Sequence, residues 1–176
     1  TATGTITVTP LNTIAPGTNQ TVCLNSPITT INLATTGATG ATFSGLPAGV
    51  TGSWAGNVAT ISGTPTVAGT FNYTVTTTGG CPPASTTGVI TVTPLNTIAA
   101  GTSQTVCLNS PISTINLATT GATGATFSGL PAGVTGSWAG NVATISGTPT
   151  VAGTFNYTVT TTGGCPPATA TGTITV

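Results

Sequence analysis

The sequence predicts an all-β protein made of two copies of one small β-sandwich, and three observations carry this prediction. Thr, which favours strands, supplies 48 of the 176 residues. Gly, Pro, Asn and Ser, which favour turns, break the chain at intervals near the 8–12 positions that are usual in a sandwich or barrel. The third observation is that no segment keeps a helical apolar period over three turns.

The pattern of strands and turns occurs twice, because TVTPLNTIA at Thr7–Ala15 returns at Thr91–Ala99, a shift of 91 − 7 = 84 positions. Residues 9–92 and 93–176 match at 78 of 84 positions, since only six differ. Residues 1–8 and 169–176 both read TATGTITV. We therefore expect residues 1–8 to be the final strand of a preceding repeat, followed by repeats 9–92 and 93–176, all taken from a longer array.

The clearest strand within a repeat is Thr70–Thr76, where Phe71, Tyr73 and Val75 alternate with polar residues and so form one apolar face. The last strand, Gly88–Thr93, places Ile90 and Val92 on one face. Seven or eight short strands in each repeat make one sandwich domain. The other expected strands are Gln20–Leu24, Thr29–Thr35, Ala41–Ser44, Thr51–Trp54 and Val58–Ser62.

The chain contains no Asp, Glu, Lys, Arg or His. General acid–base catalysis needs such side chains, so we expect no enzyme activity. Metal ions need carboxylates, imidazoles or clustered thiolates, so we expect no metal and no cofactor. Nucleic acids and anionic membranes are bound through Lys and Arg, so neither is an expected partner. No apolar run approaches the roughly 18 residues of a membrane-spanning helix, so we expect no membrane insertion.

Each repeat has two cysteines, and their separation is the same in both (81 − 23 = 58 and 165 − 107 = 58). This spacing does not fit a zinc knuckle, and no base is present to activate a thiolate. We therefore expect structural disulfides within each repeat, Cys23–Cys81 and Cys107–Cys165, with pairing between neighbouring repeats or chains as the alternative. Either pairing places the protein in an oxidising, extracellular compartment.

The largest apolar side chain of each repeat is its single Trp, Trp54 or Trp138. We expect a core Trp whose indole N–H binds a backbone carbonyl. The alternative is an exposed platform for sugar rings. Rows of Thr such as Thr5-Ile6-Thr7-Val8 could likewise meet surface glycans, although Thr is also a common uncharged strand residue.

The segment GLPAGVTGSWAGNVATISGTPTVAGTFNYTVTTTGGC, at Gly45–Cys81 and again at Gly129–Cys165, resembles the repeats of giant surface proteins of Bacteroidetes, including the SprB-type gliding adhesins. Its central part, Ser62–Val75, also resembles bacterial immunoglobulin-like and PKD-like modules. The resemblance implies an immunoglobulin-like sandwich, export by type IX secretion, and a cell-surface filament that serves adhesion or gliding motility.

The function expected from these observations is that of a structural repeat in a long extracellular filament or adhesin stalk. Its partners would be the neighbouring repeats, and the lack of net charge favours lateral self-association into thicker filaments. Two alternatives remain: a passive spacer array in a secreted multidomain enzyme, and a glycan-binding module. Unlike many PKD-like and cadherin-like modules, the repeats have no acidic residues for calcium at their junctions.

Overall fold

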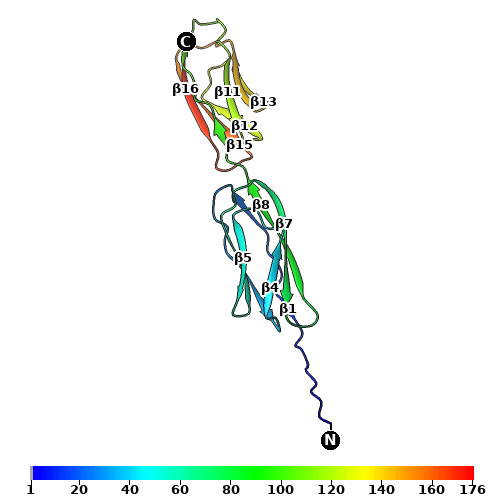
Figure 1. The fold of residues 1–176 in the computed structure, drawn as a ribbon. Coiled ribbons are helices and arrows are strands. Elements are labelled where there is room, and N and C mark those ends of the chain that lie inside the picture. The colour runs from blue at the N-terminus through cyan, green and yellow to red at the C-terminus, as the bar shows by residue number, and fades with distance from the viewer. Residues whose placement is uncertain (1) are drawn as a thin grey trace. The chain divides into compact units, whose positions relative to one another are not determined.

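The computed structural model describes residues 2–176, and all the regular secondary structure in this range is β (Figure 1). The chain forms two compact units, the first ending at Thr93 and the second comprising Pro94–Val176. Within the described range no helix is long and apolar enough to cross a membrane. The all-β prediction is confirmed, and each unit can be described by itself.

Unit 1 is a sandwich of two four-stranded sheets, ordered β1-β3-β6-β5 and β2-β8-β7-β4. All neighbouring strands are antiparallel except β2 and β8, which are parallel. Two sheets with these crossovers have the strand arrangement of an immunoglobulin domain. The strands are β1 Thr13–Ile14, β2 Gln20–Cys23, β3 Ile31–Thr36, β4 Gly40–Ser44, β5 Val50–Ala55, β6 Val58–Gly63, β7 Gly69–Thr78 and β8 Ser85–Thr93.

Unit 2 repeats this topology with the sheets β9-β11-β14-β13 and β10-β16-β15-β12. Its parallel pair is β10 with β16, the counterpart of β2 with β8. The strands are β9 Thr97–Ile98, β10 Gln104–Thr105, β11 Ile115–Thr120, β12 Gly124–Ser128, β13 Val134–Ala139, β14 Val142–Gly147, β15 Thr154–Thr162 and β16 Thr169–Thr175.

The seven strands expected in the first repeat are all present, with ends shifted by a few positions. The sequence did not predict the very short strand β1, which does not extend far enough to show alternation. The tightest connection is the β5–β6 hairpin, where Gly56 (φ 55°) and Asn57 (φ 65°) form the whole turn. Gly and Asn tolerate positive φ, and two such residues give the turn twist that suits antiparallel strands.

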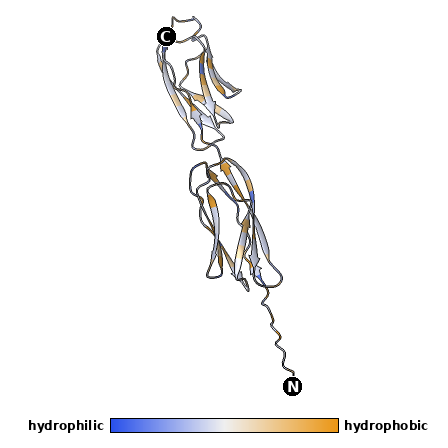
Figure 2. Cartoon of the chain, in the orientation of Figure 1, coloured by the Kyte–Doolittle hydropathy of each residue, from blue (hydrophilic) through white to orange (hydrophobic). Residues whose placement is uncertain are grey.

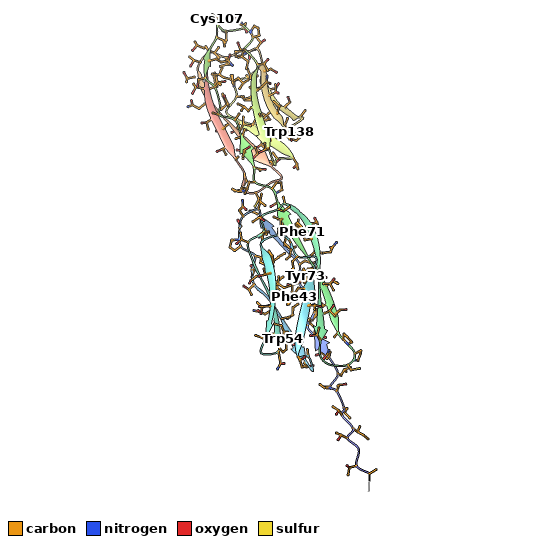
Figure 3. All side chains as sticks on the ribbon, viewed as in Figure 1. Phe43, Trp54, Phe71, Tyr73, Cys107 and Trp138 are labelled. Atoms are coloured by element: carbon orange, nitrogen blue, oxygen red, sulfur yellow. The ribbon has the colours of Figure 1, made fainter. Side chains whose placement is uncertain are left out.

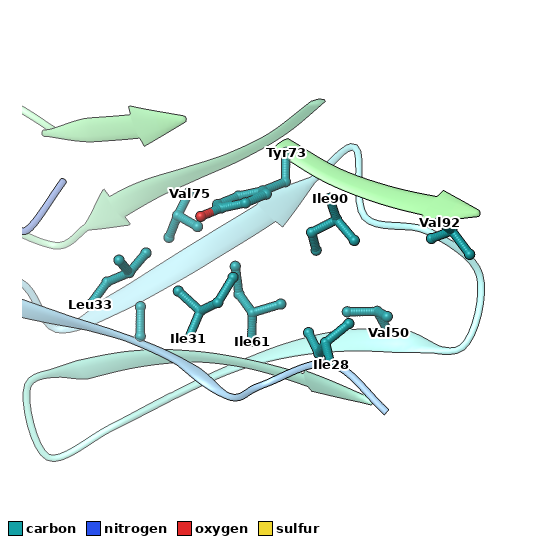
Figure 4. Packing of buried hydrophobic residues seen from close by; sticks show 10 residues of the cluster. Ile28, Ile31, Leu33, Val50, Ile61, Tyr73, Val75, Ile90 and Val92 are labelled. Atoms are coloured by element: carbon teal, nitrogen blue, oxygen red, sulfur yellow. The ribbon is translucent and has the colours of Figure 1, made fainter. Parts of the chain in front are cut away.

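The core of each unit is made of aliphatic side chains from alternating strand positions. In β3 the alternate residues Ile31, Leu33 and Thr35 are buried, and the residues between them are exposed. Figure 4 shows this cluster closing between the two sheets of unit 1, and Figure 2 shows hydrophobic residues interspersed along the strands with weakly polar ones. Its buried members are Ile28, Ile31, Leu33, Val50, Ala59, Ile61, Tyr73, Val75, Ile90 and Val92.

The polar group that reaches this core cluster is the phenol of Tyr73, whose side chain is completely buried (Figure 4). The Thr18 N–H donates to the phenol oxygen at 3.0 Å, and the phenol O–H donates to the Thr18 carbonyl at 2.9 Å. A Cβ at Gly88 would lie 2.4 Å from this oxygen, so the site needs glycine there. Tyr157 forms the same pair of hydrogen bonds with Thr102. The phenol thus fixes the segment before β2 to the core.

Residues 2–8 have no regular secondary structure, and Ile6 is 92% exposed. The equivalent Ile90 and Ile174, in the last strand of each unit, are fully buried. The expectation that this segment is the last strand of a preceding repeat stays a prediction, and its first residue lies outside the described range.

Replacing the buried phenol tests how much this hydrogen-bond pair contributes. We expect Tyr73→Phe to lower the free energy of unfolding of unit 1 by about 1–3 kcal/mol, because both backbone groups of Thr18 lose a buried partner. Tyr157→Phe should do the same in unit 2. The measurement is urea unfolding followed by tryptophan fluorescence. Val89→Thr, a difference already present between the repeats at Thr173, is the control and should change stability by less than about 0.5 kcal/mol.

Candidate functional site

The reactive side chains of each unit are its two cysteines, and they lie at opposite ends of the sandwich. Cys23 is the last residue of β2 and pairs with Thr93, the last residue of β8. Cys81 lies in the loop between β7 and β8, and its N–H donates to the Pro10 carbonyl at 3.1 Å. We call Cys23 and Cys107, which lie beside the last strand residues of their units, the trailing cysteines. We call Cys81 and Cys165, which lie beside the first residues of their units, the leading cysteines.

Unit 2 holds its cysteines in the same way. Val106 N–H donates to the Thr175 carbonyl at 2.9 Å, so the adjacent Cys107 lies beside the end of β16. Figure 3 shows Cys107 at one extreme of this unit. The N–H of Cys165 donates to the Pro94 carbonyl at 3.1 Å, which places Cys165 beside the first residue of unit 2.

The loop that carries each leading cysteine is fixed by its own hydrogen bonds and by close packing. In unit 1, three hydrogen bonds between Thr77 and Ala84 close the loop. The Thr77 N–H and hydroxyl donate to the Ala84 carbonyl at 2.8 and 3.1 Å, and the hydroxyl oxygen accepts from the Ala84 N–H at 2.8 Å. Gly80 packs so tightly that a Cβ there would lie 1.9 Å from the Asn12 Oδ1. The backbone thus presents the leading thiol from a defined position.

The four cysteines are in two oxidation states. Cys23 and Cys165 are disulfide-bonded and half-buried, whereas Cys81 and Cys107 carry free thiols and are exposed. Each unit therefore has one disulfide-bonded cysteine and one free cysteine.

The expected bonds within repeats, Cys23–Cys81 and Cys107–Cys165, are wrong, because each contains a free thiol. The strand pairing gives the reason. Cys23 lies at the end of β8 near Val92, whereas the loop of Cys81 joins β8 at its other end, Ser85. The strand between these two ends spans roughly 23 Å, while the Cα atoms of a disulfide lie about 4.4–6.8 Å apart.

Local sequence patterns could not exclude these bonds. Cys23 ends an early strand that runs parallel to the last strand, and Cys81 follows the strand before the last. Loops at the start and end of one strand lie at opposite ends of a sandwich. The missing signal was the parallel β2–β8 pairing, which joins segments as distant in the sequence as Gln20 and Ile90 and has no local sequence mark.

The Trp residues, expected in the core, pack against the core clusters and are only half-buried (Figure 3). The expected backbone partner of the indole is wrong: Trp54 Nε1–H donates to the Thr35 hydroxyl at 3.0 Å, and that hydroxyl donates to the Asn57 carbonyl at 3.0 Å. Trp138 donates to Thr119 at 3.1 Å in unit 2. The indole N–H is thus engaged inside the unit and is not presented to a sugar.

A surface pocket in unit 1 is lined by residues of the β7–β8 sheet and of the segment before β2. Its side chain Asn19 already accepts a hydrogen bond from the Val89 N–H at 2.8 Å. At the same place in unit 2, Ser103 accepts from the Thr173 N–H at 3.0 Å. These side chains hold the segment before the parallel strand β2 or β10 against the last strand of each unit. Its lining residues are Gly17, Asn19, Asn72, Thr87, Gly88 and Val89.

Comparison with solved structures supports the immunoglobulin-like fold. The titin I-band fragment I67–I69 matches with a TM-score of 0.64 and 12% identity, over 94% of this chain and 65% of that one. A Glu-to-Ala variant of the same three domains matches with a TM-score of 0.67 and 12% identity, over the same shares. Titin A168–A169 matches with a TM-score of 0.52 and 12% identity, over 94% of this chain and 98% of that one. At such identity the likeness shows the fold alone.

This chain thus spans about two thirds of the length of the three-domain titin fragment and 98% of the A168–A169 fragment. No protein-family model and no curated protein matches the sequence. The solved structures above are titin fragments, and their likeness to this chain concerns the fold.

The tight packing of the leading-cysteine loop can be tested at Gly164. A Cβ there would lie 1.9 Å from the Asn96 Oδ1 and 2.6 Å from the Gly121 carbonyl oxygen. We expect Gly164→Ala to destabilise unit 2 by about 1–3 kcal/mol through overpacking, measured by urea unfolding. Gly140→Asn is the control, since Gly140 has open space around it and a φ of 55° that Asn tolerates. Equal stability of both variants would contradict the packing argument.

Proposed function

We propose that this chain is a structural repeat segment of a long extracellular filament or adhesin stalk at a cell surface. The observation that carries the proposal is that two nearly identical repeats each form a complete immunoglobulin-like sandwich. In each unit the polar side chains described above serve the fold: the phenol, the indole and the pocket residue Asn19 or Ser103 all bind within the unit. Such a unit is suited to adding length.

The composition supports the same role and argues against an enzyme. With no carboxylate, imidazole, amine or guanidinium side chain, the repeat lacks the usual groups of acid–base catalysis. The two disulfide-bonded cysteines favour an oxidising, extracellular location, because cytosolic thiols are kept reduced. The resemblance of Gly45–Cys81 to repeats of Bacteroidetes gliding adhesins makes adhesion or gliding motility, with type IX secretion, the proposed setting.

The zero net charge also supports lateral self-association of such filaments, since no electrostatic repulsion keeps neighbouring chains apart. The second candidate is a passive spacer array in a secreted multidomain enzyme. It is favoured by the same internal use of polar groups, which leaves little for a ligand to recognise. Binding of surface glycans is the least supported, because the indole N–H and the pocket residue Asn19 already have partners.

The function is tested by immunogold electron microscopy of whole cells with an antibody against the folded repeat. Gold particles in lines along filaments that leave the cell surface are the expected result. Cells in which the repeat array is deleted provide the control and should lose both gold and filaments. Diffuse gold on the surface, or gold in the medium with no filament, would instead support the spacer.

The absence of charged side chains predicts that stability is insensitive to solution conditions. Between about pH 4 and 7, from about 0.01 to 0.15 M salt, and with or without EDTA, we expect the melting temperature to change by less than about 2 °C, because no carboxylate or imidazole side chain changes charge and no side-chain ion pair is screened. The measurement is thermal unfolding followed by circular dichroism. A shift on adding EDTA would contradict the expectation.

The matched control introduces a cross-strand ion pair where the chain has a neutral hydrogen bond. Thr60 Oγ1–H donates to the Asn32 Oδ1 at 3.1 Å on neighbouring strands. The double variant Asn32→Asp with Thr60→Lys should become sensitive to salt and acid. The expected size is about 0.2–1 kcal/mol, the usual contribution of such a pair. Since the depressed carboxylate pKa of an ion pair adds stability above its unfolded value, the gain should be lost on acidification.

A further inference from the structure

We propose that two copies of this chain bind each other through the edge strand β5, or through its equivalent β13 in unit 2, paired in antiparallel register. The occupant of each edge is the same strand of a second chain, so that two four-stranded sheets continue into one. The inference rests on the lateral self-association proposed above and names the surface that carries it. Every feature used lies within one sandwich, and unit 1 serves as the example.

The strand β5 is the longest of the four edge strands of unit 1. The two sheets end at β1 and β5 and at β2 and β4, which contain 2, 6, 4 and 5 residues respectively. The edge at β2 is partly covered, because the Gln20 side chain donates to the Thr29 carbonyl and accepts from the Thr29 N–H, both at 3.0 Å. Short or covered edges resist pairing with another chain, whereas a longer open edge is a template for it.

The hydrogen bonds of the β5–β6 hairpin show which residues of β5 bind β6. Its two-residue turn joins Ala55 to Val58, which lie opposite each other and exchange hydrogen bonds in a hairpin of this kind. Beyond the other end of β5, the Thr64 N–H donates to the Gly49 carbonyl at 3.0 Å. Since bonded residues alternate along an antiparallel pair, both ends give the same result: the odd-numbered residues of β5 bind β6.

The backbone groups of Gly52 and Trp54, at even positions, therefore point away from β6 to the free edge of the sheet. β5 is the last strand in the order β1-β3-β6-β5. Within residues 2–176, the backbone N–H and carbonyl groups of Gly52 and Trp54 have no hydrogen-bond partner outside the ladder with β6. A strand laid along this edge finds two N–H donors and two carbonyl acceptors, arranged as in any antiparallel ladder.

The side chains of β5 leave this edge open. Thr51, Ser53 and Ala55 are exposed on the outer face of the sheet, and all three are small and uncharged. Natural edge strands are commonly protected by Lys, by Pro or by a bulge. β5 contains no Pro, its six residues pair one to one with β6, and the sequence has no charged side chain. Nothing in the strand therefore opposes pairing with a second strand.

A second copy of β5 fits this edge because the strand is complementary to itself about Ser53. In the antiparallel register that places Ser53 opposite Ser53 of the second chain, Gly52 lies opposite Trp54, and these two residues exchange both hydrogen bonds. The half-buried indole then lies beside a glycine whose inner face is filled by the Phe43 ring, since a Cβ at Gly52 would lie 2.2 Å from that ring. The indole thus gains an aromatic neighbour, and the contact is isologous.

Unit 2 carries the same edge. β13 has the sequence and the burial pattern of β5 and ends at the same two-residue turn. The Thr148 N–H donates to the Gly133 carbonyl at 3.0 Å, so the alternation of bonded residues is also the same. Gly136 and Trp138 therefore present the free backbone groups in this unit. Each repeat offers one such edge, and the lack of net charge leaves no electrostatic repulsion between two chains.

The experiment is sedimentation velocity of the full chain at increasing concentration, with Cys81 and Cys107 alkylated so that no disulfide joins two chains. We expect reversible association of the chains. The tryptophan emission maximum should move to shorter wavelength over the same concentration range, because Trp54 and Trp138 lose exposure to water at the paired edge. A chain that stays monomeric throughout, or that associates with no change of emission, would overturn the proposal.

A charge placed on the edge provides the variant. Ser53→Lys with Ser137→Lys puts like charges directly opposite each other and should weaken association at least about fivefold. Ser44→Lys with Ser128→Lys is the matched control, because it adds the same charge at exposed positions of the other edge strands, β4 and β12. At about 0.15 M salt the control should weaken association by less than about twofold. The opposite ranking of the two variants would assign the contact to β4 and disprove the proposal.

Mixing opposite charges tests the register and separates a lost contact from a lost fold. Chains with Ser53→Lys and Ser137→Lys are mixed with chains that carry Ser53→Glu and Ser137→Glu. Each variant should bind the other at least about fivefold more tightly than it binds itself, and about 1 M salt should remove this preference. If both variants keep the circular dichroism spectrum of the parent and show no preference, the proposed pairing is wrong.

This outcome is separable from that of the proposed function. Gold along filaments on cells, together with chains that stay monomeric in solution, would keep the filament and remove the β5 contact. Association in solution with the expected response to charge, but without filaments on cells, would keep the contact and remove the filament.

Discussion

The packing of one aliphatic sheet face against the other is the interaction on which both units depend. An immunoglobulin domain of an antibody adds a disulfide between its two sheets, on the strands equivalent to β3 and β7. Here the corresponding strands contribute Leu33, Tyr73 and Val75 to the core and no cysteine. The chain has no charged side chains and so forms no side-chain ion pair. Apolar burial, with the hydrogen bonds of the sheets, must therefore overcome the conformational entropy of a small domain.

Such a small core explains how the few buried polar groups are used. The Tyr73 phenol, the Thr35 hydroxyl and the Thr77 hydroxyl each bind a loop or an edge segment: Thr18, Asn57 and Ala84 respectively. Unpaired buried polar groups cost free energy, so these bonds hold loops at fixed positions. Thr35 and Thr77 continue the buried alternation of β3 and β7 past the last aliphatic residue. Thr thus serves as a strand residue on the surface and as a loop anchor at the ends of the core.

Local patterns in the sequence were sufficient to predict the strands but not the positions of the cysteines. Alternation in Thr70–Thr76 and Gly88–Thr93 predicted the strands β7 and β8, and the burial of alternate residues in both strands confirms their apolar faces. The short strand β1 and the hydroxyl partner of Trp54 depend on segments brought together by folding. The same holds for the cysteines, because the parallel β2–β8 pair places Cys23 beside Thr93. A register between residues so distant in the sequence leaves no periodic mark in either segment.

The positions of the cysteines are set within each sandwich by the strands and loops that carry them. The two leading loops are nearly identical in sequence, and both trailing cysteines lie beside the end of the last strand of their unit. Since the N–H groups of Cys81 and Cys165 donate to equivalent carbonyls, Pro10 and Pro94, the near-identity of the repeats extends to the backbone contacts of these loops. Each sandwich therefore holds one cysteine at either end, and no cysteine contributes to the core that stabilises it.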